Sequence, residues 1–228
     1  MTLNFYTKIK ILFLNFMFFS KHASFYRFLL KKIKFSKSQV FQDLFVLYFL
    51  NCKKNGNFIE IGGGNGIDIS NSYILEKKYK WSGTICEPNK TLQKKIIKSR
   101  SAKLIKEPVT EKCYKNMVFY ENFDPYQSST IKSSKVEKII KMKSICLNHL
   151  MKKIYYKKSI DYISIDTEGN EYEILKNFNF RKFKVKILTI EHNFNNEKRQ
   201  KIFKLMKRNN FERMFTNLSY MDDWYIRV

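Results

Sequence analysis

The chain has 228 residues, of which 44% are hydrophobic and 16% aromatic. This composition excludes a disordered chain, and the length suits one domain with a sizeable core. Lysine and arginine number 44 against 20 acidic residues, so the formal charge is +24. Because the lysines are spread along the whole chain, we interpret this charge as a mostly solvated surface. The specific partners it would otherwise suit are nucleic acid, an anionic membrane or an acidic glycan.

Residues 1–36 differ from the rest and form a predicted N-terminal helical extension. Residues 11–19 are apolar apart from one Asn, but nine residues are too few to cross a bilayer, and no small-residue cleavage site follows. Residues 25–34 place apolar side chains at helical spacing beside Arg and Lys. This basic amphipathic helix either lies on a membrane surface or packs on the domain.

From residue 37 to 228 the pattern predicts one domain of alternating helices and strands. Helices are expected at 38–50, after Asn65, and at 90–100, 146–154, 170–177 and 197–209, with a loop-rich segment at 107–135. Strands are expected at 57–61, 83–87, 102–105, 161–166 and 185–191, with a closing pair at 211–215 and 224–228. This order predicts an α/β, doubly wound, Rossmann-like fold with a mostly parallel seven-stranded sheet.

The four cysteines, Cys52, Cys86, Cys113 and Cys146, are widely separated and form no CxxC pair. With only three histidines in the chain, a zinc cluster is not expected. We therefore expect reduced thiols in a cytoplasmic protein.

A glycine-rich turn follows the strand at 57–61. Glycine tolerates turn conformations that other residues resist, and it allows a ligand to approach the main chain. The spacing fits neither a dinucleotide fingerprint nor a P-loop. It fits an acidic residue followed by glycines at alternate positions, Glu60, Gly62, Gly64 and Gly66. That arrangement resembles the first motif of class I methyltransferases, which bind S-adenosylmethionine.

The chemistry of this cofactor suits the nearby side chains. Carboxylates form strong hydrogen bonds with an ammonium and with ribose hydroxyls, which favours Glu60 and Glu87 as ligands. Glu87 ends the second strand, 21 residues after Gly66, close to the usual spacing of a ribose-binding acid. Pro88 is assigned to the same site, and Asn71 could bond the carboxylate of the cofactor.

Six short pieces in order resemble the FkbM family of methyltransferases over roughly residues 38–228. They are Ser38-Gln39-Val40-Phe41-Gln42-Asp43, Phe58-Ile59-Glu60-Ile61-Gly62, Ser70-Asn71-Ser72 with Glu76, Trp81 to Asn89, Asp166-Thr167-Glu168-Gly169-Asn170-Glu171, and Ile190-Glu191-His192-Asn193. The resemblance implies O-methylation, commonly of sugar or polyketide hydroxyls. Gly63-Gly64 and Ser72 depart from the usual pattern, and glycine at 64 would loosen the contact with the amino-acid end of the cofactor.

Catalytic candidates follow the last two parallel strands. Asp166 ends a strand beside the expected switch point and is predicted to be the general base or to orient the substrate. Glu168 and His192 are further candidates, His192 because its ordinary pKa lies near 6.5. Glu171 is expected to stabilise a helix N-terminus. By analogy with metal-dependent members of the wider fold, Asp166, Glu191 and Asn193 could hold Mg²⁺.

Together these features predict an S-adenosylmethionine-dependent O-methyltransferase acting on a sugar hydroxyl of a cell-surface glycan or of its lipid-linked precursor. The expected location is the cytoplasm, with peripheral contact at the inner face of the membrane. An RNA methyltransferase is an alternative, because the high positive charge suits nucleic acid. Enzymes that methylate amino groups typically carry an Asn-Pro-Pro-Tyr-like element after the fourth strand, where this chain has Asp166-Thr167-Glu168. A second alternative is a non-catalytic, membrane-associated module with this fold.

Overall fold

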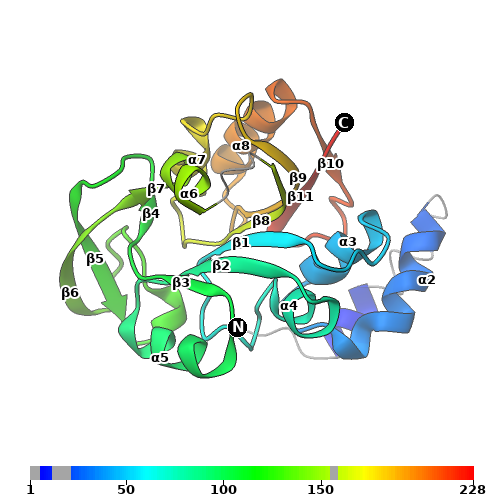
Figure 1. The fold of residues 1–228 in the computed structure, drawn as a ribbon, viewed down its shortest axis with the longest axis horizontal. Coiled ribbons are helices and arrows are strands. Elements are labelled where there is room, and N and C mark those ends of the chain that lie inside the picture. Colours follow the sequence, from blue (N-terminus) through cyan, green and yellow to red (C-terminus); the bar gives the residue numbers. More distant parts are fainter. Residues whose placement is uncertain (1–5, 12–21, 155–158) are drawn as a thin grey trace.

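A computed structural model describes residues 6–11, 22–154 and 159–228 (Figure 1). The apolar stretch of residues 11–19 lies outside the described residues, apart from Ile11. Within the described ranges, we find no helix with the length and apolar character needed to span a bilayer.

A seven-stranded sheet forms the centre of the molecule, in the order β10-β11-β9-β8-β1-β2-β3. Its strands are β1 (Asn57–Ile61), β2 (Ser82–Cys86), β3 (Lys103–Ile105), β8 (Ser159–Ile165), β9 (Lys184–Glu191), β10 (Phe211–Met214) and β11 (Asp222–Arg227). The five strands from β3 to β9 pair in parallel, whereas β11 runs antiparallel to both β9 and β10. The predicted fold class is therefore confirmed.

Helices cover both faces of this sheet (Figure 1). One face carries α3 (Gln42–Phe49), α4 (Tyr73–Tyr79) and α5 (Lys90–Ser99), and the other carries α6 (Leu147–Ile154), α7 (Glu171–Lys176) and α8 (Asn196–Arg208). Side chains alternate between the faces, so Phe58 joins the core under α3 and α4, while Ile59 and Ile61 join the core under α6 to α8. Burial on both faces explains why these strands read as apolar runs.

The N-terminal helix α2 (Ala23–Lys32) is followed by a 3-10 turn, η2 (Ile33–Phe35), and packs on α3. Phe25, Tyr26 and Leu29 are buried, and the Phe25 ring stacks on Phe215 with 4.3 Å between ring centroids. Arg27 and Lys31 remain exposed. Of the two arrangements considered for this helix, the apolar face therefore packs on the domain.

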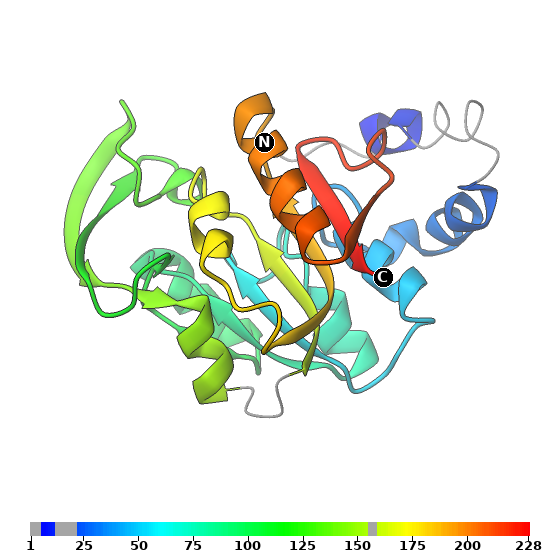
Figure 2. The same ribbon diagram turned by 90° about the horizontal axis from the view of Figure 1, so that it is seen from above.

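The segment expected to be loop-rich, residues 107–135, is mostly irregular but contains two strands. It contains β4 (Val109–Thr110), β5 (Asn116–Asn122) and a 3-10 turn, η3 (Pro125–Gln127), and it continues into β6 (Val136–Lys143) and β7 (Ile145–Cys146). β5 and β6 form an antiparallel hairpin that projects from the body of the molecule (Figure 2). Most of residues 107–135 is therefore irregular, as expected, and the main strand that the sequence did not predict there is β5.

The helix expected after Asn65 begins only at Tyr73. Residues 65–72 instead form an irregular connection, in which the Asn65 side chain accepts hydrogen bonds from the N–H groups of Ile67 and Asp68. Such local side-chain bonds compete with helix formation.

Candidate functional site

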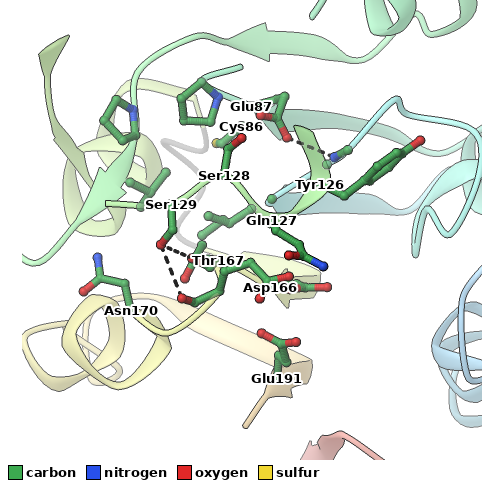
Figure 3. A pocket seen from close by; sticks show the side chains of 18 of the residues that line it. Cys86, Glu87, Tyr126, Gln127, Ser128, Ser129, Asp166, Thr167, Asn170 and Glu191 are labelled. Atoms are coloured by element: carbon green, nitrogen blue, oxygen red, sulfur yellow. Dashed lines mark hydrogen bonds between the residues drawn. The ribbon is translucent and has the colours of Figure 1, made fainter. Parts of the chain in front are cut away.

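A cavity of about 420 Å³ opens at the carboxyl ends of β1, β2, β8 and β9. This edge includes the boundary between β1 and β8, where consecutive connections leave in opposite directions, and such a switch point is the usual ligand site of an open α/β sheet. The opposite wall comes from residues 124–130 (Figure 3). Polar side chains and bare main chain thus face one another across the cavity.

The glycine turn, residues 62–66, forms one wall of the cavity. Gly62 has a φ of +82°, and a Cβ there would collide with the Asp166 carbonyl oxygen. Gly64 has a φ of +54° and lies against the Tyr126 ring. Both conformations favour glycine, and the absence of side chains exposes the main chain to a ligand. Gly62 and Gly64 line the cavity, whereas Gly66 packs against Ile96 and Arg100 on α5 and its C-terminal end.

Glu87 lies at the rim beside this turn (Figure 3). One carboxylate oxygen accepts a hydrogen bond from the Gly64 N–H at 3.0 Å, and the other accepts from the Asn89 N–H at 2.9 Å. Glu87 is 5% exposed, and burial raises its pKa to about 8. Pro88 also lines the cavity. A buried carboxylate next to bare main chain can accept hydrogen bonds from the hydroxyls of a ligand.

Glu60 lies behind the turn and not in the cavity. Its carboxylate accepts hydrogen bonds from the Ser70 and Ser72 hydroxyls and from the Asn71 N–H. Arg100 lies 3.8 Å from it and donates to the Gly66 carbonyl at 2.7 Å. The predicted contact of Glu60 with a cofactor is therefore corrected. Its side chain points to the face of the sheet that α4 and α5 cover, where it holds the connection after the turn.

Asn71 lines the cavity, but its bonding differs from the expectation. Its Nδ2 donates to the Ser164 hydroxyl at 2.9 Å, and its buried Oδ1 has no hydrogen-bond partner within the described part of the chain. An oxygen that needs a donor suits an ammonium group and not a carboxylate. The Oδ1 atom of Asn71 can therefore accept from an ammonium group, while the predicted bond from Asn71 to the cofactor carboxylate stays a prediction.

Three carboxyl groups lie close together in the cavity, at the carboxyl ends of β8 and β9. Oxygens of Asp166, Glu168 and Glu191 lie within 4.8 Å of one another, and Glu191 points toward Asp166 (Figure 3). We call these three residues the acidic cluster. Burial raises the pKa of all three groups, and the neighbouring carboxylates raise it further. The pKa of Asp166 lies well above its ordinary value. One oxygen of Glu191 is buried without a hydrogen-bond partner among the described residues.

Glu171 has the structural role expected of it. One of its oxygens accepts hydrogen bonds from the N–H groups of Thr167 and Gly169, and the other pairs with Lys198 at 2.8 Å. These bonds fix the start of α7 and the turn that carries Glu168.

His192 is buried beside the site without lining the cavity. Its Nδ1 accepts a hydrogen bond from the Phe194 N–H at 3.1 Å, and burial lowers its pKa. Because His192 does not line the cavity, its ring is not placed to take a proton from a ligand there. The predicted catalytic role of His192 is therefore corrected, whereas its neighbour Asn193 does line the cavity.

The loop of residues 124–130 is a part of the site that the sequence marks only weakly. The Ser129 hydroxyl donates to the Thr167 and Glu168 carbonyl oxygens, at 3.0 and 3.3 Å. Tyr126 and Gln127 line the cavity beside it, and so does Gln39 from the segment before α3. Only Asp124-Pro125, a common turn signal, marks this loop in the sequence.

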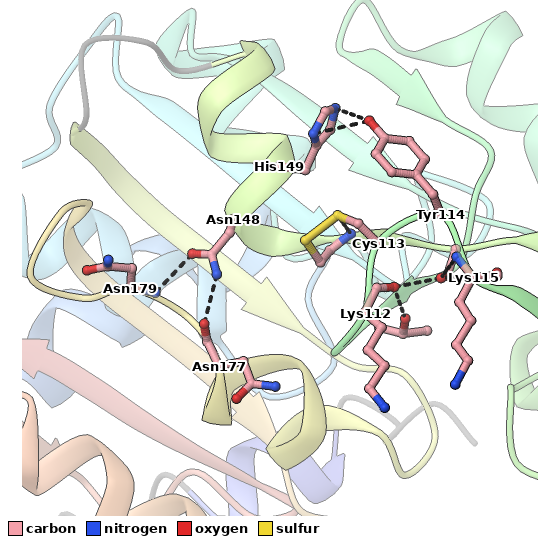
Figure 4. Close-up of a disulfide and its surroundings, with 11 residues drawn as sticks. Lys112, Cys113, Tyr114, Lys115, Asn148, His149, Asn177 and Asn179 are labelled. Atoms are coloured by element: carbon pink, nitrogen blue, oxygen red, sulfur yellow. Dashed lines mark hydrogen bonds between the residues drawn. A yellow bond between two sulfur atoms is a disulfide. The ribbon is translucent and has the colours of Figure 1, made fainter.

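A disulfide joins Cys113 to Cys146, whereas Cys52 and Cys86 are free (Figure 4). The expectation of four reduced thiols is therefore wrong for one pair. The parallel pairing of β4 with β7 brings Thr110 opposite Cys146, and the turn after β4 carries Cys113 to the same place. A separation of 33 residues leaves no motif in the sequence.

A family model described as "Methyltransferase FkbM domain" matches residues 60–222, which include the glycine turn, Glu87, the loop 124–130 and the acidic cluster. Among solved structures, the chain is similar to methyltransferase FkbM from Methylobacillus flagellatus KT, with 13% identity and a TM-score of 0.48 over 75% of this chain and 43% of that chain. It is also similar to precorrin-6y C5,15-methyltransferase from Geobacter metallireducens GS-15, with 10% identity and a TM-score of 0.46 over 81% and 86%. A comparison with curated proteins gives no match.

Proposed function

Because the chain belongs to the FkbM family and is an S-adenosylmethionine-dependent methyltransferase, we propose that it methylates a sugar hydroxyl of a cell-surface glycan or of its lipid-linked precursor. One observation carries the proposal. The cavity joins a cofactor-like wall, the glycine turn with Glu87, to an acidic cluster that can take up a hydroxyl proton.

S-adenosylmethionine fits the first of these walls. The volume of about 420 Å³ is within the range of pockets for small ligands. Gly62 and Gly64 leave main chain bare, the Glu87 carboxylate can accept from ribose hydroxyls, and the Asn71 Oδ1 can accept from the ammonium group. When bound, the cofactor supplies an electrophilic methyl group on a sulfonium sulfur. We assign Gly62, Gly64, Asn71, Glu87 and Pro88 to its binding.

The acidic cluster provides the base that O-methylation needs. As the acceptor oxygen forms its bond to carbon, the hydroxyl proton must pass to another group. A carboxylate with a raised pKa is a stronger base once ionised, and Asp166 lies beside the Gly62 turn, where cofactor and acceptor would meet. We assign proton transfer or acceptor orientation to Asp166, whose pKa is kept high by burial and then by the neighbouring Asp222 and Glu168 carboxylates.

A polyhydroxylated acceptor suits the remaining lining. Gln39, Gln127, Asn170 and Asn193 bring amide side chains to the cavity. An amide both donates and accepts hydrogen bonds, as a sugar hydroxyl does. These side chains can therefore match the hydroxyl pattern of a sugar around the one that is methylated.

The acidic cluster can also hold a divalent cation such as Mg²⁺, with the exposed Asn193 near enough to the cavity to add an amide oxygen. The unpartnered, buried oxygen of Glu191 supports this proposal, since a buried oxygen normally has a partner. Electron paramagnetic resonance of Mn²⁺ tests it by the loss of the free-ion signal. We expect Glu191→Gln to abolish that loss and the exposed Glu197→Gln to leave it unchanged. A free-ion signal unaffected by the wild-type protein contradicts the cation site.

Membrane contact, at the inner face of the cytoplasmic membrane, remains a proposal for the lipid-linked acceptor. Phe25, Tyr26 and Leu29 of α2 are buried, and Leu30 is its one exposed large apolar side chain. Contact would therefore depend mainly on exposed cations such as Arg27, Lys31 and Lys34. Each contributes about 1 kcal/mol near an anionic leaflet. Replacing these three by Gln should reduce flotation with anionic vesicles and spare the fold. Unchanged flotation would refute docking through α2.

Transfer of a labelled methyl group from S-adenosylmethionine into cell-envelope fractions tests the acceptor class. We expect incorporation into a glycan fraction that yields a methylated sugar on acid hydrolysis, and loss of incorporation with Asp166→Asn. Incorporation into RNA at moderate salt would instead favour the alternative suggested by the charge of +24, since backbone-driven binding to nucleic acid weakens steeply with salt.

A further inference from the structure

We infer that residues 113–146 form a cap over the cavity and that the Cys113–Cys146 disulfide holds this cap closed. We call this segment the cap. The inference rests on the proposed function for the identity of the ligand beneath the cap, and it adds a thiol-dependent control of ligand binding. In a reducing compartment, a disulfide of this kind is open to exchange with thiols.

The disulfide lies at the base of the cap and encloses the segment that roofs the cavity. The enclosed chain includes Phe119 and all of residues 124–130, which line the cavity. Cys146 ends β7 and is followed directly by Leu147, the first residue of α6. The bond therefore ties the start of the cap to an element that the core of the molecule holds in place.

The rest of the cap has few buried side chains to hold it against the domain. Its hairpin, β5–β6, is a two-stranded sheet separate from the central one, and every residue of β6 is exposed or half-buried. An isolated hairpin of this kind is marginally stable. Near the base, the Ser144 N–H donates to the Lys115 carbonyl at 2.9 Å, and its hydroxyl donates to the Lys112 carbonyl at 2.6 Å (Figure 4).

Closure over the ligand depends on a few contacts at the far end of the cap. The Ser129 hydroxyl bonds to the carbonyls of Thr167 and Glu168, and Tyr126 lies against Gly64. These contacts reach both walls of the cavity at once (Figure 3). The disulfide favours them because it restricts the conformations open to the enclosed loop.

The bond is also open to a reductant. Cys113 and Cys146 are both half-buried, whereas the free Cys86 is buried. A dithiol reductant breaks the S–S bond by transferring two electrons and two protons, which yields two cysteine thiols and leaves the reductant as a cyclic disulfide. We infer that the cap then opens while the seven-stranded sheet remains folded.

Hydrogen exchange and calorimetric titration with S-adenosylhomocysteine, on the full chain before and after dithiol treatment, test the inference. We expect faster exchange confined to residues 113–146 after reduction, and an affinity lower by about fivefold or more, since ordering the cap must then accompany binding. Reoxidation should restore both. The double replacement of Cys113 and Cys146 by Ser should behave as the reduced protein, and Cys52→Ser as the untreated one.

Two results would overturn the inference. One is the titration of all four thiols when the untreated protein is unfolded in denaturant without a reductant. The other is unchanged exchange in the cap and unchanged affinity after the bond is broken. If S-adenosylhomocysteine binds neither form, the proposed function fails, and exchange in residues 113–146 still decides whether the disulfide holds the cap.

Discussion

The cofactor wall of the cavity and the cap that faces it are held by different kinds of interaction. In the cofactor wall, which consists of the glycine turn and Glu87, the strand that directly precedes each residue sets its position. Gly62 and Gly64 adopt left-handed conformations directly after β1, and Glu87 directly follows β2. In the cap, the decisive contacts join residues far apart, such as Cys113 with Cys146 and Ser129 with Thr167.

This difference indicates how the two regions respond to change. Glycines and a carboxylate fixed by the sheet leave the cofactor wall little freedom to adapt, because the strands on either side are buried. The cap has few buried side chains and can move without disturbing the core. We therefore expect substitutions in the wall to act on cofactor affinity directly, and changes in the cap to act through closure. The following expectations are arranged by the size of their effect on affinity.

Gly62→Ala should break the cofactor wall most severely. The added Cβ would collide with the Asp166 main chain at a φ that disfavours alanine, at a cost of about 3 kcal/mol or more. Calorimetry should detect no binding of S-adenosylhomocysteine, and the melting temperature should fall by about 6–12 °C. Gly64→Ala is the matched control, since its new Cβ meets a side-chain ring that can shift. Equal effects of the two substitutions would contradict the account.

Glu87→Gln should weaken S-adenosylhomocysteine binding by about 10- to 100-fold, because hydrogen bonds to a charged group contribute about 1.5–3 kcal/mol. Thermal stability should not fall, since the substitution removes a buried carboxylate. The exposed Glu107→Gln serves as the control for a change of charge nearby. Undiminished affinity in Glu87→Gln would show that this side chain does not bind the ligand.

The affinity of the wild-type protein should also depend on pH. Ribose hydroxyls favour the ionised Glu87, whose pKa is raised to about 8, so affinity should rise by at most about tenfold per pH unit below pH 8 and level off above it. The stability of the unliganded protein should depend on pH in the opposite direction. Burial favours the neutral acid, so the contribution of Glu87 to stability is fully present below its ordinary pKa of 4.5 and declines as pH rises through about 8. Glu87→Gln should flatten both profiles.

Glu60→Gln should lower thermal stability without changing the affinity for S-adenosylhomocysteine. The substitution weakens a buried network of hydrogen bonds with Ser70, Ser72 and Arg100, at a cost of about 2 kcal/mol. We expect a melting temperature lower by about 4–8 °C. Affinity for S-adenosylhomocysteine should stay within about twofold, because Glu60 lies outside the cavity. A large loss of affinity at unchanged stability would restore Glu60 as a cofactor ligand.

The sequence predicted those parts of the molecule in which local pattern and final contact coincide. The strands of the sheet are apolar runs because both their faces are buried, and the positions of Gly62, Gly64, Glu87 and Asp166 follow from strand ends. It failed where the direction of a side chain decides the role. Glu60 and Glu87 look alike in the sequence, yet Glu60 points to the face of the sheet that α4 and α5 cover.

The remaining failures concern contacts between distant residues. His192 follows a strand as Asp166 does, but it does not line the cavity, and its Nδ1 accepts a hydrogen bond from the Phe194 N–H. The apolar pairs of the β5–β6 hairpin, such as Phe119 with Ile140, form between residues distant in the sequence, and the disulfide depends on the pairing of β4 with β7. Neither leaves a local signal, so a structure was needed to find the cap.

The measurement that tests the central claim most directly is a crystal structure of the protein soaked with S-adenosylhomocysteine. We expect the nucleoside against the main chain of Gly62 to Gly64, with its ribose hydroxyls on the Glu87 carboxylate and its sulfur toward Asp166. A nucleoside bound elsewhere on the molecule, or in the cavity without contact to Glu87, would contradict the account.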